Sequence, residues 1–197
     1  MLADQIQEIL PLAESKVLKT NEEYHFNIVH LLPKEGNYQL IMTDGLRSYN
    51  QPVNEKNADL KNIELYCCLP DYWNLEVKSW PIYWLERIAQ VPQKNKTWFG
   101  IGDSMPAGNP AQEMDDEFKA NHFILSSPLY LNEEFSLFRE KLGFQPLAVI
   151  PIFQTEIDYK LRNSHTILFR QFAKKGVTEL IDPYRSSACR KRVLGMI

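Results

Sequence analysis

Residues 64–103 read ELYCCLPDYWNLEVKSWPIYWLERIAQVPQKNKTWFGIGD, and this stretch decides the fold. The apolar run at 62–69 predicts a strand that is covered on both faces. Ser79-Trp80-Pro81 is typical of a helix start, with serine as the cap and proline in the first turn. Residues 97–101 predict a second, short strand. The stretch is therefore a strand, an aromatic-rich loop, a helix and a strand.

The helix after Ser79 is predicted to be amphipathic. Trp84 and Leu85 begin an apolar face that repeats at helical spacing, while Glu86 belongs to the polar face. Pro92 is expected to end the helix, because a proline inside a helix removes a backbone hydrogen bond.

Strand and helix signals continue on both sides of this stretch. Residues 4–18 predict a short helix that breaks at Pro11 and resumes as a second helical turn. The other elements are strands at 24–32, 38–43, 122–131 and 144–153, and helices near Asn132, Thr155 and Ser164. This order predicts an α+β fold in one domain spanning 1–197, with a mixed, largely antiparallel sheet flanked by helices.

The bulk composition excludes several functional classes. The formal net charge of −3 argues against nucleic acid as the main partner, since phosphate binding needs a basic surface. The chain contains no apolar run of about 18 residues that would predict a membrane span. Three cysteines without a CxxC motif predict free thiols and a cytoplasmic protein. No cofactor motif is found.

The triplet Gly102-Asp103-Ser104 resembles the core of one family of serine esterases. A serine nucleophile needs a base, so a hydrolase predicts Ser104 within hydrogen-bond reach of His122 or His165. The expected Asp-x-x-His pair near the C-terminus is missing. We therefore predict no catalytic residue and interpret Gly102-Asp103 as a turn in which the aspartate accepts backbone N–H bonds. A serine hydrolase using Ser104 is the alternative.

A metal-binding protein is the second alternative. The acidic residues at 113–117 lack the spacing of a calcium loop. A zinc site would need the scattered histidines to gather in space with other ligands. We therefore predict no metal site and a solvated acidic loop. The four histidines are His25, His30, His122 and His165.

Most of the aromatic residues are expected in the core. Tyr72 and Trp73 lie in a predicted loop, however, and Trp98 lies on a short strand. Aromatic residues in such places are typical anchors for a protein or peptide partner. We predict these three residues as partner-binding.

Four stretches together resemble the suppressor of fused family. The stretches are 40–48 (LIMTDGLRS), 64–73 (ELYCCLPDYW), Trp80 to Gly102-Asp103, and Gly143-Phe144 through Pro151-Ile152 to Glu156, with 182–185 as a closing echo. The resemblance covers a core of about 24–188 and leaves 189–197 as a basic C-terminal tail.

The resemblance implies a non-enzymatic, protein-binding domain. Animal members of the family bind zinc-finger transcription factors, with the bound peptide added as a strand. Compact bacterial members are thought to be immunity proteins that neutralise toxins, and this chain resembles the compact type. The family's peptide-binding aspartate follows a glycine after the tryptophan-bearing helix and the next strand, and Asp103 stands at that position. The tyrosine that assists it in the animal proteins is not matched here, because Ile88 or a neighbour occupies that region.

Overall fold

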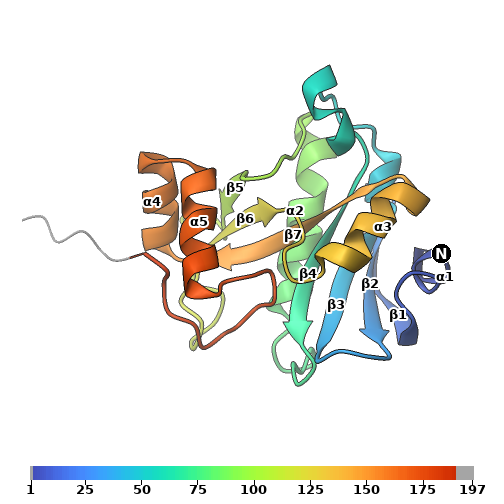
Figure 1. Ribbon diagram of the computed structural model, residues 1–197, viewed down its shortest axis with the longest axis horizontal. Coiled ribbons are helices and arrows are strands. Elements are labelled where there is room, and N and C mark those ends of the chain that lie inside the picture. Colours follow the sequence, from blue (N-terminus) through green and yellow to red (C-terminus); the bar gives the residue numbers. More distant parts are fainter. Residues whose placement is uncertain (1, 190–197) are drawn as a thin grey trace, which may run out of the picture.

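The computed structural model describes residues 2–189, which contain one seven-stranded sheet in the order β1-β2-β3-β4-β7-β6-β5 (Figure 1). Strands β4 and β7 are parallel, and the other described neighbours are antiparallel. The strands are β1 (Leu12–Asn21), β2 (Phe26–Pro33), β3 (Tyr38–Asp44), β4 (Ile63–Pro70), β5 (Ser104–Pro106), β6 (His122–Ser126) and β7 (Gln145–Ile152). The predicted α+β class, with a mixed and largely antiparallel sheet, is confirmed.

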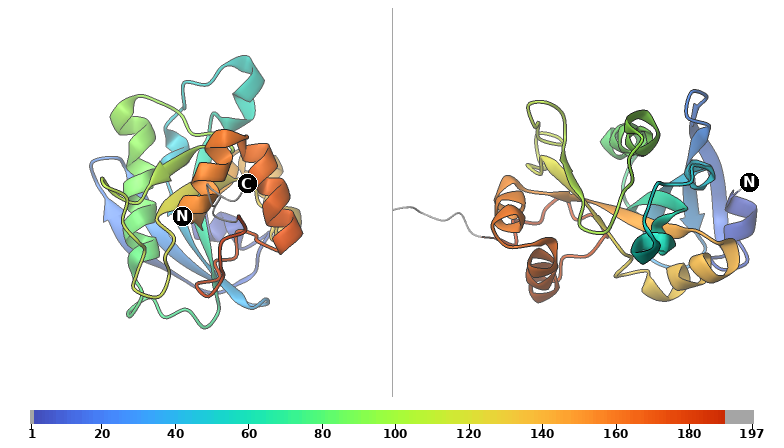
Figure 2. Two further views of the ribbon diagram at one scale, coloured as in Figure 1. Left: turned by 90° about the vertical axis from the view of Figure 1, so that its left-hand side faces the viewer. Right: turned by 90° about the horizontal axis from the view of Figure 1, so that it is seen from above.

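Helices cover both faces of the sheet, and Figure 2 shows α2 and α3 on opposite sides of it. The helices are α1 (Leu2–Ile6), α2 (Trp80–Asn95), α3 (Asn132–Leu142), α4 (Gln154–Arg162) and α5 (His165–Lys175), with short 3₁₀ turns η1 (Leu46–Ser48) and η2 (Glu55–Leu60). None of these helices is long and apolar enough to cross a membrane. The basic segment Arg190-Lys191-Arg192 lies outside the described residues.

Strand β4 lies between two hydrophobic cores. Leu65 and Cys67 pack in the core beneath α2, whereas Tyr66 and Cys68 pack in the core beneath α3 and α5. Every residue of β4 is buried, because successive side chains point to opposite faces and both faces are covered. The prediction of a strand covered on both sides is confirmed.

Three predictions about local structure are wrong. Residues 12–21 form the edge strand β1 and not a second helical turn; most of its side chains are exposed, so apolar spacing could not mark it. Residues 97–101 are not a strand, and the strand comes later, as β5. Helix α2 does not end at Pro92 but continues to Asn95, with Pro92 itself buried.

The carboxylate of Glu179 ties the C-terminal part of the chain to the start of α3. It is buried and accepts hydrogen bonds from the backbone N–H groups of Leu129, Tyr130 and Leu131 at 2.8–3.1 Å. The hydroxyl of Tyr66 on β4 donates to it at 3.3 Å. One side chain thus joins the last segment, the central strand and the residues that lead into α3.

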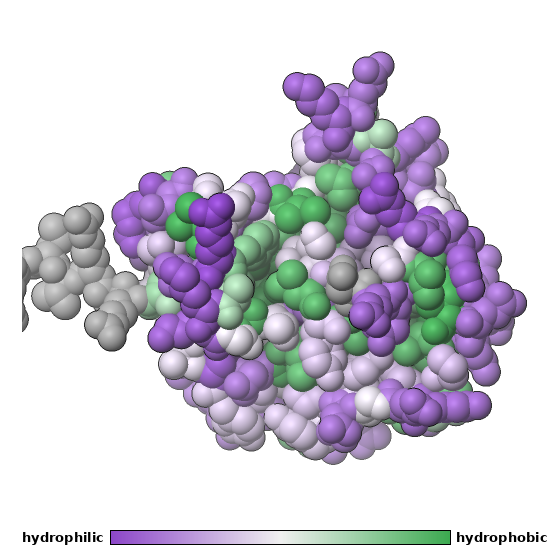
Figure 3. Space-filling view, viewed as in Figure 1, coloured by the Kyte–Doolittle hydropathy of each residue, from purple (hydrophilic) through white to green (hydrophobic). Residues whose placement is uncertain are grey.

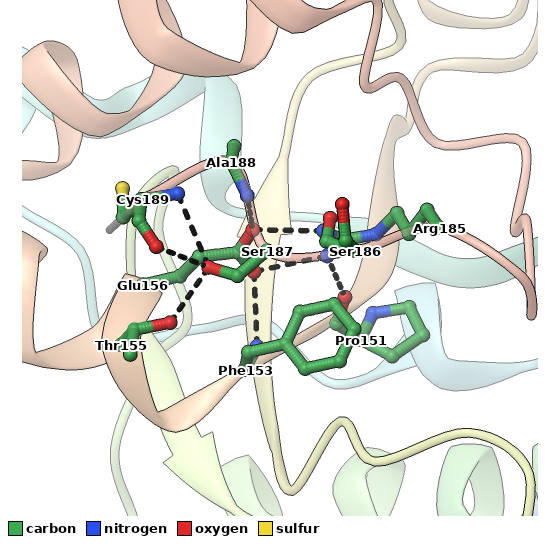
Figure 4. Close-up of polar contacts among 9 residues, drawn as sticks. All are labelled: Pro151, Phe153, Thr155, Glu156, Arg185, Ser186, Ser187, Ala188 and Cys189. Atoms are coloured by element: carbon green, nitrogen blue, oxygen red, sulfur yellow. Dashed lines mark hydrogen bonds and ion pairs between the residues drawn. The ribbon is translucent and has the colours of Figure 1, made fainter. Parts of the chain in front are cut away.

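A second buried carboxylate, Glu156 of α4, holds residues 185–189 (Figure 4). Its two oxygens accept from the Arg185 guanidinium at 2.7 and 3.0 Å, and one also accepts from the Ala188 N–H at 2.8 Å. The Phe153 N–H donates to the other oxygen at 2.9 Å, and the guanidinium lies 4.7 Å from the Phe153 ring centre. The Thr155 hydroxyl in the first turn of α4 bonds the Ser187 hydroxyl at 2.6 Å.

A third buried carboxylate, Glu64, titrates near neutral pH. It accepts from the Thr43 hydroxyl at 2.5 Å and from the Gly45 N–H at 3.0 Å. Burial nevertheless raises the pKa of Glu64 from 4.5 to about 7, because these bonds only partly offset the loss of water.

Glu64 therefore makes stability depend on pH. Below pH 4.5 the group is protonated in both states, and between pH 4.5 and 7 the folded protein holds the proton that the unfolded chain has lost. Stability from this group falls by roughly 3 kcal/mol across that window and stays level above it. The Glu64→Gln variant has no such group. We therefore expect the wild type to lose roughly 3 kcal/mol of unfolding free energy relative to the variant as the pH rises from 4.5 to 7. Urea unfolding at pH 4.5–8 measures it, and a pH-independent difference would contradict the assignment.

Candidate functional site

The Gly102-Asp103 turn leads into the edge strand β5. Gly102 has a φ of +89°, and any side chain there would collide with the His165 ring at the start of α5. The Asp103 carboxylate is exposed but accepts a hydrogen bond from the Gly100 N–H at 2.8 Å. The turn that the sequence predicts, with the aspartate as backbone acceptor, is confirmed.

Strand β5 offers an unpaired backbone edge beside Asp103. Its inner edge pairs with β6: Asp103 C=O accepts from Leu125 N–H at 2.8 Å, and Ala107 N–H donates to Asn121 C=O at 2.9 Å. Because hydrogen-bonded residues alternate in an antiparallel pair, the backbone groups of Ser104 and Pro106 point outward. Pro106 has no N–H to donate. Because its backbone faces away from β6, no hydrogen bond between β5 and β6 is lost. The free edge therefore offers the Ser104 N–H and two carbonyls.

The Ser104 hydroxyl bonds a lysine and not a histidine. Lys160 Nζ of α4 donates to Ser104 Oγ at 2.6 Å, and among residues 2–189 this is the hydroxyl's only partner. Partial burial lowers the pKa of Lys160, and the charge of Asp103 opposes that change. The histidine base that the hydrolase alternative requires is not in contact with Ser104. The lysine was not foreseen, since only the fold brings α4 to β5.

Trp98 lies in the same loop as Asp103. Its six-membered ring packs so closely on Gly100 that a Cβ there would sit 2.7 Å from it. Trp98 is partly buried and packs against the core beneath α2. The structure thus brings two of the predicted partner-binding residues, Trp98 and Asp103, together around Gly100.

Beside this turn lies a cavity of about 570 Å³ between Ile101, the Ser127-Pro128 loop and α3. Ile101 is 41% exposed at its edge. On this side of the molecule, hydrophobic side chains gather between α5 and α3 within a mostly polar surface (Figure 3). A hollow with a mixed lining is therefore present two residues before Asp103, with Ile101, Pro128 and Phe135 on its apolar part and charged residues of η2 and α3 around them.

Tyr72 and Trp73 lie elsewhere, beyond the end of β4 and separated from β5 by β7 and β6. Tyr72 is 65% exposed. Trp73 is only 6% exposed, packs edge-to-face on Trp80, and donates its indole N–H to the Lys78 carbonyl at 2.9 Å. Trp73 therefore has a packing role, and its role in binding stays a prediction. Both residues line a small cavity with Tyr184, which the sequence did not single out.

Among the described residues, no three His, Cys, Asp or Glu side chains gather in a way that could hold a metal ion. Glu113 and Glu117 of the acidic loop instead pair with Lys119 at 2.8 Å and Lys78 at 2.5 Å.

The fold is that of a known family of proteins. The family model described as Suppressor of fused protein (SUFU) matches residues 22–186. The chain therefore belongs to the suppressor of fused family. No match was found among curated proteins.

Solved structures have the same fold. A putative SUFU homolog from Neisseria gonorrhoeae FA 1090 superposes with a TM-score of 0.67 at 15% identity, covering 95% of this chain and 94% of that one. Drosophila Suppressor of Fused gives a TM-score of 0.52 at 12% identity, covering 91% of this chain and 44% of that one. A chain of the Sufu–Fu complex gives 0.52 at 12% identity, with 95% and 82% covered.

Proposed function

We propose that this chain is a non-enzymatic protein-binding domain that adds a segment of its partner to the free edge of β5. The observation that carries the proposal is the unpaired Ser104–Pro106 edge, with the exposed Asp103 carboxylate at its start. Main-chain bonds supply affinity in strand addition, and flanking side chains supply specificity. The hollow next to Ile101 lies beside the start of this edge, and its mixed polar and apolar lining offers contacts to a side chain of such a segment.

The partner that we propose is a toxin domain, which the chain would neutralise as a bacterial immunity protein. Support comes from the resemblance to compact family members, and a putative SUFU homolog from Neisseria gonorrhoeae FA 1090 has the same fold. We also propose a cytoplasmic location. Its support is that Cys67, Cys68 and Cys189 are free and buried, as thiols in a reducing compartment are.

Two variants of one residue separate strand addition from hydrolysis. Ser104→Pro removes the outward N–H without breaking a bond to β6, whereas Ser104→Ala removes only the hydroxyl. Partner binding should weaken at least tenfold in Ser104→Pro and stay unchanged in Ser104→Ala, which is about 1.4 kcal/mol of difference. Partners are captured on the immobilised chain from lysate of its own source, identified by mass spectrometry, and titrated as purified proteins.

Asp103→Ala is expected to weaken partner binding at least tenfold. The variant loses the carboxylate at the start of the β5 edge, and with it the proposed hydrogen bond between this charged group and the partner segment. Asp103→Asn, which can keep the bond from Gly100, tells loss of charge from loss of the turn. Melting temperatures show whether each variant is folded. Equal binding by folded Ser104→Pro and wild type would exclude strand addition at β5.

The immunity role has its own readout. Co-expression of the chain should restore growth to a bacterial host that makes the captured partner, and Ser104→Pro should fail to do so. Rescue that is lost in Ser104→Ala would instead support chemistry by the Ser104–Lys160 pair, since a lysine with a lowered pKa can act as a base.

A further inference from the structure

Two neighbouring cavities lie on either side of Val77 and Lys78. A cavity of about 390 Å³ lies between residues 77–80 and 114–117, and one of about 190 Å³ lies between residues 72–78 and 183–184. Val77 and Lys78 line both. We call the combined feature the aromatic groove and define it by Tyr72, Val77, Lys78, Trp80, Pro183 and Tyr184.

The walls of the aromatic groove expose large hydrophobic side chains. Tyr72 is 65% exposed, and Val77 and Tyr184 are each 75% exposed. Tyr184 is held in place by its neighbours: its N–H donates to the Asp182 carboxylate at 2.8 Å, and the next residue is anchored by Glu156. Two tyrosine faces are thus presented to solvent on an ordered backbone, at little entropic cost on binding.

The groove is surrounded by negative charge. Asp115, Asp116 and Glu117 line one end, where the one lysine, Lys78, is already paired with Glu117 at 2.5 Å. At the other end, burial and then the charge of Asp182 raise the pKa of Tyr72, so that carboxylate lies near the phenol. Negative charge around exposed aromatic rings favours a cation and repels phosphate.

Two polar atoms of the lining residues have no hydrogen-bond partner in the described part of the chain. They are Nε1 of Trp80, a side chain of which 9% is exposed, and Oδ2 of Asp115. An unpaired buried donor or acceptor costs about 1–3 kcal/mol, and a bound group that paired with it would recover part of this. Nε1 is a donor and Oδ2 is an acceptor, and both atoms are closed off from solvent in this structure.

We propose that the aromatic groove binds an arginine-bearing peptide segment of a protein partner, as a second contact beyond the β5 edge. The guanidinium stacks on the tyrosine rings because it is planar and charged. It also donates hydrogen bonds to the carboxylates, because its N–H groups lie in one plane at a spacing that matches a carboxylate. The proposed β5 contact and this one use different residues, so each can fail without the other.

The test is an NMR titration of the full chain, labelled with ¹⁵N, with the capped peptide Gly-Arg-Leu-Arg-Gly. The control peptide has citrulline in place of arginine, which keeps the shape and removes the charge. The indole N–H signals of Trp73 and Trp80 should shift with saturation, whereas that of Trp98 should stay still. Binding should be at least tenfold weaker for citrulline, and weaker in 500 mM than in 50 mM salt.

Variants locate the binding. Asp116→Asn with Glu117→Gln should weaken it at least fivefold, and so should Tyr184→Ala. The matched controls change equally exposed residues elsewhere, Glu22→Gln with Glu133→Gln, and should bind as wild type does. The inference is overturned if citrulline binds equally, if Trp98 shifts as much as Trp80, or if both groove variants, shown to be folded by their spectra, bind like wild type.

Discussion

Glu179→Ala is expected to lower the free energy of unfolding by about 3–5 kcal/mol, which is a large effect for a single substitution. The carboxylate is 1% exposed and accepts from three consecutive backbone N–H groups at 129–131 and from the Tyr66 hydroxyl. Removing it leaves these buried donors without an acceptor, and each costs about 1–3 kcal/mol. Chemical denaturation at pH 7 measures the change.

A matched control separates this role from a simple change of charge. Glu133→Ala removes an exposed carboxylate from the first turn of α3, where it stabilises the helix dipole only weakly. We expect it to cost less than about 1 kcal/mol. If Glu179→Ala were as mild as Glu133→Ala, the N–H groups would have found water, and the link between α3 and the last segment would be dispensable.

The second large effect is expected at Glu156 and Arg185. Glu156 is 0% exposed, and its two-pronged contact with Arg185 is among the most buried ion pairs described. Arg185→Met leaves the carboxylate buried without its cation, which costs about 3–5 kcal/mol. Glu156→Gln should be nearly as costly, because Arg185 then faces a neutral group.

The double variant tells pairing from packing. Once both charges are gone, Glu156→Gln with Arg185→Met should lose clearly less stability than the sum of the two single variants. Additive losses would mean that the pair is not coupled. The same variants should also loosen the 182–185 segment, so peptide binding at the aromatic groove should weaken even where the protein stays folded.

The central elements could be predicted because their sequence patterns agree with their surroundings. Strand β4 is apolar on both faces and is covered on both faces, and α2 begins at Trp80 as its proline signal indicates. The edges could not be predicted. Strand β1 exposes most of its side chains, and β5 is three residues long and contains a proline, so neither has the alternating apolar pattern that identifies a strand.

One missed strand explains another error. Glu86 was predicted on the polar face of α2 but is 9% exposed, because Lys19 of β1 bonds it at 2.6 Å. The candidate site shows the same limit. The Gly102-Asp103 turn could be predicted from its residue types, but the outward N–H of Ser104 depends on pairing with β6, and Tyr184 meets Tyr72 only through the tertiary fold.

The parallel pairing of β4 with β7 has a consequence for how the chain acquires its structure. Strands β1 to β4 form a meander of sequence neighbours, which can pair early, whereas β7 joins β4 only after 74 intervening residues, 71–144, have been placed. Contacts between distant residues are slow to form because loop closure costs entropy first. During synthesis, the edge of β4 that pairs with β7 therefore stays unpaired until most of the chain has left the ribosome. We infer that this edge, and not the native surface, is where a chaperone would be needed.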